Sequence, residues 1–339
     1  MRTIAIANQK GGCGKTTTAV NLAAALAEKG LRVLMADLDP QGHATLGFGC
    51  GPDGSDKTIY DALTNPKISI SRIIVGTNVE GLKLAPSNVL LSGAELELSG
   101  VAGRHLVLGE QLRMVSSEYD VCVIDCPPSL GLLTLNALVA STDVIIPVQV
   151  NYYAMEGLKQ LLETANIIRV HFHPCSVKIL GLLLTFVENR IIFSRQIQQQ
   201  MREYFGDLVF DTVIHRTVRL AEAPSAGESV LTYAPGSRGA VEYMALAEEV
   251  IEGRPSEKRT SDDKTVVEEV SSGEAVAGEV DDGRPSEEGT SDDKTVAEEV
   301  SSGEAVAEGV DDGEPSAEEK SNGEDAAEET ADGKLWMRR

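Results

Sequence analysis

Apolar and polar residues alternate along the first 253 positions in a pattern that separates strands from helices. Short aliphatic runs typical of strands buried on both faces lie between longer segments with apolar residues at helical spacing. The predicted strands lie at residues 2–7, 32–36, 82–85, 121–125, 144–148, 178–186 and 208–214. The predicted helices lie at residues 15–29, 106–116, 130–140, 154–170, 194–205 and 239–252. This alternation predicts an α/β fold with a mostly parallel, doubly wound sheet that binds ligands at the carboxyl ends of its strands.

A glycine-rich loop joins the first predicted strand to the first predicted helix. It reads Lys10-Gly11-Gly12-Cys13-Gly14-Lys15-Thr16-Thr17. Glycines let backbone N–H groups turn toward an anion, and the N-terminus of the next helix adds its dipole. Lys15 is suited to neutralise phosphate charge, and the Thr16 hydroxyl is suited to bind Mg²⁺. The general phosphate loop has a glycine where Gln9 stands, so this loop is a variant with an extra lysine, Lys10.

Three carboxylates follow predicted strands. Asp37 and Asp39 follow the second strand, and Asp125 ends the fourth. Their placement predicts a site for Mg²⁺ and for a water molecule that attacks phosphate. The alternative interpretations are a turn-capping pair ahead of Pro40 and an ordinary polar strand end at Asp125.

The loop resembles the deviant Walker A motif, K-G-G-x-G-K-[ST], of the group of ATPases that includes ParA, MinD and the nitrogenase iron protein. Further segments resemble the ParA/Soj partition ATPases within that group. These are Asp37-Leu38-Asp39-Pro40-Gln41-Gly42, Pro86-Ser87-Asn88, the run from Val121 to Gly131, Glu156-Gly157-Leu158 and Val218-Arg219-Leu220-Ala221-Glu222-Ala223-Pro224-Ser225. The resemblance covers residues 1–253.

The resemblance implies a slow, Mg²⁺-dependent ATPase that acts as a switch. Lys10 is expected to reach the partner's phosphates in an ATP sandwich homodimer, where it stabilises charge during phosphoryl transfer. Asp39 is expected to orient the attacking water, Asp37 to support Mg²⁺ indirectly, and Asp125 to hold it through water. The implied partners are nonspecific DNA and a ParB-like protein that stimulates hydrolysis, and the implied location is the cytoplasm, on the nucleoid.

Basic residues in the last third of the ATPase region suggest where DNA binds. Six arginines are spread there: Arg190, Arg195, Arg202, Arg216, Arg219 and Arg238. Any one of them is explained well as ordinary surface charge, but together they could contact phosphates without reading sequence. The resemblance assigns nonspecific DNA binding to Arg190 and Arg219.

The chain departs from the ParA pattern at three positions. His43 replaces a usual Asn, His215 a usual Pro, and Thr217 a common Asn. The last two border the base and DNA face in relatives, so they could alter nucleotide selectivity and DNA affinity. We interpret His43 and His215 as loop residues rather than catalysts.

The segment at residues 254–339 is different in composition. It has 10 basic and 27 acidic residues, a net charge of −17, whereas residues 1–253 have a net charge of −6. It has no Leu, Ile, Phe, Tyr or Trp between Arg254 and Lys334, and it repeats with a period of 30 residues. Such composition buries too little apolar surface to offset ordering, so we expect a disordered acidic tail rather than a solenoid.

Three alternative functions remain open from the sequence. A related ATPase could position division or cargo complexes, although the acidic tail lacks the basic amphipathic helix of a MinD-type membrane anchor. A reductase component like the nitrogenase iron protein needs an iron–sulfur cluster, for which Cys126 is a conceivable ligand. A pure DNA scaffold would not need Asp39. We expect no membrane partner, since no apolar run approaches the ~20 residues that span a bilayer. The five cysteines fit a reducing cytosol.

Overall fold

The computed structural model describes residues 1–51, 56–150 and 177–252. Its strands are β1 (Arg2–Ile6), β2 (Val33–Asp37), β3 (Val75–Gly76), β4 (Leu82–Ala85), β5 (Val121–Asp125), β6 (Asp143–Gln149) and β7 (Lys178–Thr185). They form one sheet in the order β3-β4-β2-β5-β1-β6-β7. All neighbouring strands run parallel except β3, which is antiparallel to β4. The predicted fold class, a mostly parallel α/β sheet, is confirmed.

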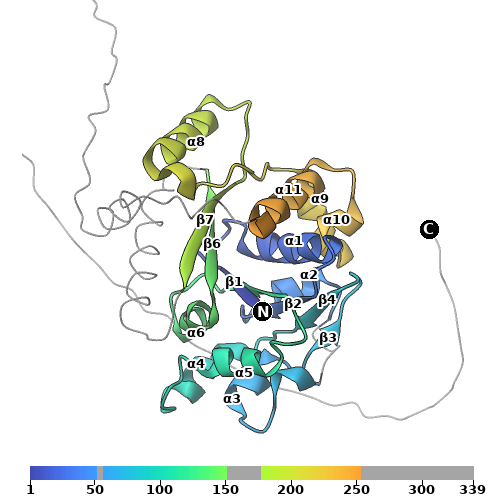
Figure 1. Ribbon diagram of the computed structural model, residues 1–339, viewed down its shortest axis with the longest axis vertical. Coiled ribbons are helices and arrows are strands. Elements are labelled where there is room, and N and C mark those ends of the chain that lie inside the picture. The colour runs from blue at the N-terminus through green and yellow to red at the C-terminus, as the bar shows by residue number, and fades with distance from the viewer. Residues whose placement is uncertain (52–55, 151–176, 253–339) are drawn as a thin grey trace, which may run out of the picture. The chain divides into compact units, whose positions relative to one another are not determined.

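Helices cover both faces of this sheet (Figure 1). The α-helices are α1 (Lys15–Glu28), α2 (His43–Gly47), α3 (Ile59–Thr64), α4 (Leu91–Leu98), α5 (Val107–Met114), α6 (Leu132–Ala140), α8 (Ile192–Phe205), α9 (Val218–Glu222), α10 (Val230–Tyr233) and α11 (Arg238–Glu252). Three 3₁₀ turns are η1 (Ile70–Arg72), η2 (Gly206–Leu208) and η3 (Ala223–Ala226). Helices α1, α2, α10 and α11 lie over one face, and α3, α4, α5 and α6 lie over the other (Figure 1).

The apolar core follows the period-two alternation of the strands. Ile4 and Ile6 of β1 pack with the α1 and α11 residues, whereas Ala5 packs with the α3–α6 residues. The inner turns of α1 are rich in alanine, which is the best helix former and lets the helix lie close to the sheet. The central strand is therefore buried on both faces, as its continuous aliphatic sequence predicts.

The strand register brings the predicted site residues together. Ile6 of β1 pairs with Asp125 of β5, and Asp37 of β2 pairs with the same Asp125. The glycine-rich loop, which follows β1, and both aspartates thus meet at one edge of the sheet. This is the carboxyl edge of a parallel sheet, where such folds bind ligands.

One predicted strand is wrong. Residues 208–214 form the end of η2 and an irregular segment beside β7, with an isolated bridge between Leu182 and Val209. The apolar pattern resembles a strand, but the amides of Asp211 and Thr212 donate to the Glu249 carboxylate at 3.1 and 2.7 Å instead of to a neighbouring strand. Side-chain capping from α11 therefore interrupts the ladder.

Other differences concern short elements. The sequence pattern did not predict α2, α3, α4, α9, α10 or β3, which span eight residues or fewer. The predicted helix at 154–170, the Glu156-Gly157-Leu158 segment and the acidic tail lie outside the described residues. Within the described part of the chain, no helix has the length and apolarity needed to cross a membrane.

Candidate nucleotide site

The glycine-rich loop between β1 and α1 has the backbone geometry of a phosphate cradle. Gly12 and Gly14 have φ values of 71° and 89°, in the left-handed region that only glycine adopts without strain, and Gly14 is the N-cap of α1. The loop is anchored on both sides. The Lys10 amide donates to Asn8 Oδ1 at 3.0 Å, and Thr185 Oγ1 of β7 donates to the Cys13 carbonyl at 2.8 Å.

The two lysines of the loop are in different situations. Lys15 is 7% exposed, and its ammonium donates to the Lys10 carbonyl at 3.1 Å, so it lies over the loop where a phosphate would bind. The Lys10 side chain is half-buried, and its ammonium makes no hydrogen bond or ion pair with any residue that the structure describes. The Lys15 ammonium is therefore part of the cradle, whereas the Lys10 ammonium is available to bind a group from another molecule.

Asp125 is a buried carboxylate without a protein partner. Both of its oxygens are buried, and neither accepts a hydrogen bond from the described residues. Burial, followed by the charge on Asp37, holds the pKa of Asp125 well above its usual range, and the nearby Thr16 hydroxyl and Lys15 charge offset part of this rise. Buried polar atoms are normally satisfied, so this pair of oxygens fits a bound cation. Oxygen ligands beside a phosphate cradle suit Mg²⁺.

Both carboxylate oxygens of Asp37 accept hydrogen bonds from residues of the chain. Its Oδ2 accepts hydrogen bonds from the amide and hydroxyl of Thr45 at 2.8 and 2.7 Å, and its Oδ1 accepts the Asp39 amide at 3.1 Å. Burial raises its pKa to about 6, although these hydrogen bonds favour the ionised form. Asp37 therefore holds the segment that follows β2 and adds negative charge beside Asp125.

Asp39 lies in that held segment and is 7% exposed. Its Oδ1 accepts the Gln41 amide at 2.9 Å, and no described group donates to Oδ2. Its carbonyl accepts the Ser87 hydroxyl at 2.8 Å, and the Ser87 amide donates to Thr45 Oγ1 at 2.9 Å. The Pro86-Ser87-Asn88 segment is thereby joined to the loop that carries Asp39, and one carboxylate oxygen remains free for a water molecule.

Two clefts border the first turn of α1 and complete the site. The larger has a volume of about 730 Å³ and is lined mainly by apolar groups: Gly14, Thr17, Thr185, Phe186, Ile214, His215, Arg216, Thr217, Val218, Leu220, Ala221, Pro224 and Tyr243. The smaller, of about 360 Å³, is lined in part by Thr16, Asn21, His43 and Glu228. An apolar cleft that begins at a phosphate cradle has the character expected of a nucleotide-base site.

The predicted DNA-binding residues are not part of the phosphate cradle itself. Arg190 follows β7 and is exposed, and its side chain has no partner among the described residues. Arg219 lies on α9, where its guanidinium is paired with Glu222 at 2.9 Å. Arg202, Arg216 and Arg238 also pair with carboxylates. Of the six arginines, Arg190 and Arg195 are the ones that the described part of the chain leaves unpaired.

Several contributors were missed from the sequence. Asn8 and Thr185 hold the loop from the ends of β1 and β7, and Thr45 holds Asp37. Polar residues directly after apolar strands are the signal that could have identified Asn8 and Thr185. Thr45 had no such signal, because it is eight residues from Asp37 and reaches it only through the turn into α2.

The three departures have separate places. His43 begins α2 and is exposed, and the Thr217 side chain accepts the Leu220 amide at 3.3 Å as the N-cap of α9. His215 lies in the irregular segment before α9, as predicted, but its side chain is buried. Cys126 is also completely buried, which argues against a cluster that this cysteine would share across a subunit interface.

Comparison with known proteins agrees with this geometry. Residues 1–179 match a family model described as an AAA domain. The sporulation initiation inhibitor protein Soj of Bacillus subtilis is 49% identical over 73% of this chain and 97% of its own length. The chromosome-partitioning ATPase Soj of Thermus thermophilus is 46% identical over 74% of this chain and 96% of its own length.

A solved structure shows the same fold around a nucleotide. Cobyrinic acid a,c-diamide synthase from Mycobacterium smegmatis, with bound ADP and magnesium, is 36% identical and superposes with a TM-score of 0.67, over 77% of this chain and 98% of its own. The cradle, the unpartnered Asp125 oxygens and the apolar cleft account for ATP and Mg²⁺ as the cofactors of this chain. From the matched domain and its partitioning relatives, the chain belongs to the ParA/Soj family of P-loop ATPases.

Proposed function

We propose that this ATPase partitions DNA. ATP closes two subunits into a sandwich dimer, the dimer binds nucleoid DNA without sequence preference, and a ParB-like protein stimulates hydrolysis and release. The observation that carries this proposal is the unpartnered Lys10 ammonium in a loop whose own cradle already holds Lys15. A partner's phosphates supply the negative charge that this cation lacks in the single chain.

The site residues have separate roles in this proposal. Thr16 and Asp125 would hold Mg²⁺, and Asp37 would support it indirectly while it holds the Thr45 turn. The bound ion supplies neutralisation of phosphate charge. Asp39 orients the water through its free oxygen, and Lys10 and Lys15 stabilise charge that develops on the transferred phosphate.

The direct test of the dimer is molecular mass in solution. Multi-angle light scattering should show a dimer with Mg²⁺ and a nonhydrolysable ATP analogue, and a monomer with ADP. A monomer under both conditions would reject the sandwich mechanism.

Related functions are less well supported. The M. smegmatis protein is named as a diamide synthase rather than as a partitioning protein. It is 36% identical to this chain, whereas the two partitioning relatives are 46% and 49% identical, so the partitioning role is better supported. A family member that positions division or cargo complexes would use the same ATP site. Nonspecific DNA binding is required of the partitioning role, so its absence would favour the positioning role.

The DNA surface is proposed to include Arg190 and Arg219. Arg190 is the stronger candidate because no carboxylate of the described residues pairs with it, whereas Arg219 must leave Glu222 or share it. Arg190→Glu and Arg219→Glu should each weaken DNA binding and leave ATP-dependent dimerisation intact. Each lost phosphate contact should flatten the slope of log affinity against log salt by roughly one unit.

Gel shifts at several salt concentrations would measure this slope. Arg202→Glu is the matched control, since Arg202 contacts Asp211 and its backbone carbonyl. An unchanged slope and affinity in both Arg190→Glu and Arg219→Glu would show that the DNA surface lies elsewhere.

The domain organisation is also a proposal: an ATPase domain at residues 1–253 and an acidic tail at 254–339. Deleting the tail should leave ATPase activity nearly unchanged and strengthen nonspecific DNA binding. A tethered net charge of −17 competes with DNA phosphates for the same arginines. The gain should fade at high salt, because the Debye length is only ~10 Å at 0.1 M.

This comparison uses full-length and truncated protein at low and high salt. Equal DNA affinity at low salt would reject competition by the tail. A large loss of thermal stability on truncation would place the domain boundary later in the chain.

A further inference from the structure

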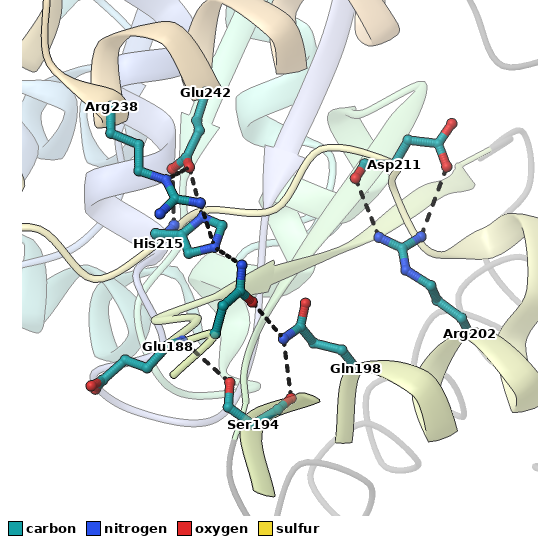
Figure 2. Close-up of polar contacts among 9 residues, drawn as sticks. Glu188, Ser194, Gln198, Arg202, Asp211, His215, Arg238 and Glu242 are labelled. Carbon is teal, nitrogen blue, oxygen red and sulfur yellow. Dashed lines mark hydrogen bonds and ion pairs between the residues drawn. The ribbon is translucent and has the colours of Figure 1, made fainter. Parts of the chain in front are cut away.

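A buried histidine joins three parts of the chain outside the phosphate cradle. His215 lies beside Arg238 and Glu242 of α11 (Figure 2). Its Nδ1 faces Glu242 Oε1 at 2.6 Å, and its backbone N–H donates to Glu242 Oε2 at 2.9 Å. Its Nε2 faces Arg238 Nη2 at 2.7 Å and Asn189 Nδ2 at 2.9 Å. Every polar atom of the imidazole therefore has a partner.

The partners decide which imidazole nitrogen carries the proton. The Arg238 guanidinium and the Asn189 amide nitrogen can only donate, so His215 Nε2 accepts from both. The proton then lies on Nδ1 and is donated to Glu242. The Asn189 amide is oriented independently, since its Oδ1 accepts from Gln198 Nε2 of α8 at 3.3 Å. With no free atom, His215 acts by holding its neighbours in place.

His215 also borders the apolar cleft beside the phosphate cradle. The cleft wall and the loop after β7 are joined there by backbone hydrogen bonds. The Val187 amide donates to the Ile214 carbonyl at 3.1 Å, and the Arg216 amide donates to the Val187 carbonyl at 3.2 Å. The hydrogen bond between His215 and Asn189 extends this connection to the residue directly before Arg190.

The first residue of the loop is strained. Phe186 has a φ of 54° and is the single non-glycine residue with positive φ in the described ranges. It lines the same cleft, and its ring lies next to Gly14 of the cradle. A strained backbone persists only where its surroundings hold it, so the conformation of this loop depends on contacts such as that from His215.

We propose that His215 is a positioning residue that couples occupancy of the base cleft to the loop carrying Arg190. A base that packs against the cleft wall orders residues 214–217. Through the His215–Asn189 hydrogen bond, ordering of residues 214–217 also restricts the motion of residues 186–191. This inference rests on the proposed function for what Arg190 then contacts, but the coupling itself needs no DNA.

Hydrogen–deuterium exchange with ADP and Mg²⁺ tests the coupling without DNA and, under the proposed cycle, without the dimer. Two substitutions separate the hydrogen bond that Nε2 accepts from the one that Nδ1 donates. His215→Gln can keep an acceptor near the position of Nε2, toward Asn189, whereas His215→Asn can keep a donor near Nδ1, toward Glu242. Asn189→Ala removes the same link from an exposed position, where folding is not at risk. Gln199→Ala, whose amide donates to Glu203 on α8, is the control.

In wild type, His215→Gln and Gln199→Ala, ADP should slow exchange at residues 186–191 by roughly two- to tenfold, the range that one net hydrogen bond supplies. In His215→Asn and Asn189→Ala this slowing should be lost at residues 188–191, beyond the backbone hydrogen bonds that hold Val187 to Ile214 and Arg216, while slowing at residues 8–18 persists and shows that nucleotide is bound. Equal slowing in all five proteins, or none in wild type, would overturn the coupling. If exchange changes as expected but wild-type protein does not bind DNA with ATP, the coupling through His215 is supported. The proposal that the loop carrying Arg190 binds DNA is then rejected.

Discussion

Lys15→Ala should abolish ATP binding while the protein stays folded. The Lys15 ammonium is the buried cation of the cradle, and among the described residues its recorded acceptor is the Lys10 carbonyl. Removing one partner of a buried ion pair costs ~3–5 kcal/mol, so ATP affinity should fall at least a hundredfold. Titration calorimetry with ATP and Mg²⁺ would measure this loss, and thermal unfolding would confirm that the variant is folded.

Lys10→Ala is the matched control from the same loop. The substitution keeps the backbone carbonyl that accepts from Lys15, so ATP affinity should change little. It removes an ammonium that has no partner among residues 1–51, 56–150 and 177–252, so the ATP dimer should be lost. Size-exclusion with ATP separates the two outcomes. A Lys10→Ala protein that still dimerises would count against the sandwich mechanism.

Asp39→Ala should keep ATP binding and trap a long-lived ATP dimer. One carboxylate oxygen accepts the Gln41 amide and the other is free, as a group that orients water requires. Loss of a positioned base or water-orienting group typically lowers turnover ~10²–10⁴-fold. Single-turnover hydrolysis of radiolabelled ATP would measure the chemical step directly.

Asp37→Ala provides the contrast for Asp39→Ala. Its carboxylate accepts three hydrogen bonds from Thr45 and the Asp39 amide, so its loss should lower thermal stability, by about 1–3 kcal/mol for each buried donor left unsatisfied. If Asp39→Ala turns over like wild type and Asp37→Ala does not, the water-orienting role belongs to Asp37.

The carboxyl edge of the sheet could be predicted from sequence because its signals are local. Three features can each be recognised from a pattern of about ten residues. They are the glycine-rich loop, the aliphatic run that ends at Asp125 and the run before Asp37. Parallel register then brings them together, and β1, β2 and β5 pair as this requires. The fold class and the position of the phosphate cradle follow from these signals alone.

Contacts between distant segments could not be predicted in this way. The buried network of His215 depends on Glu242 and Arg238, which follow it by more than 20 residues, and on Asn189 from the loop after β7. The segment at 208–214 has a strand-like pattern, but the Glu249 carboxylate of α11 accepts hydrogen bonds from two of its backbone amides. At residues 208–214 these tertiary hydrogen bonds outweigh the local strand propensity.

In the proposed cycle, ATP controls binding to DNA. Fluorescence anisotropy of a labelled, nonspecific DNA duplex should be measured at low salt with full-length protein and Mg²⁺. The three conditions are a nonhydrolysable ATP analogue, ADP and no nucleotide. We expect saturable binding with the analogue and at least about tenfold weaker binding in the other two states, with the analogue-dependent binding lost in Lys10→Ala. Equal DNA affinity in all three nucleotide states, or no binding in any of them, would contradict the proposed cycle.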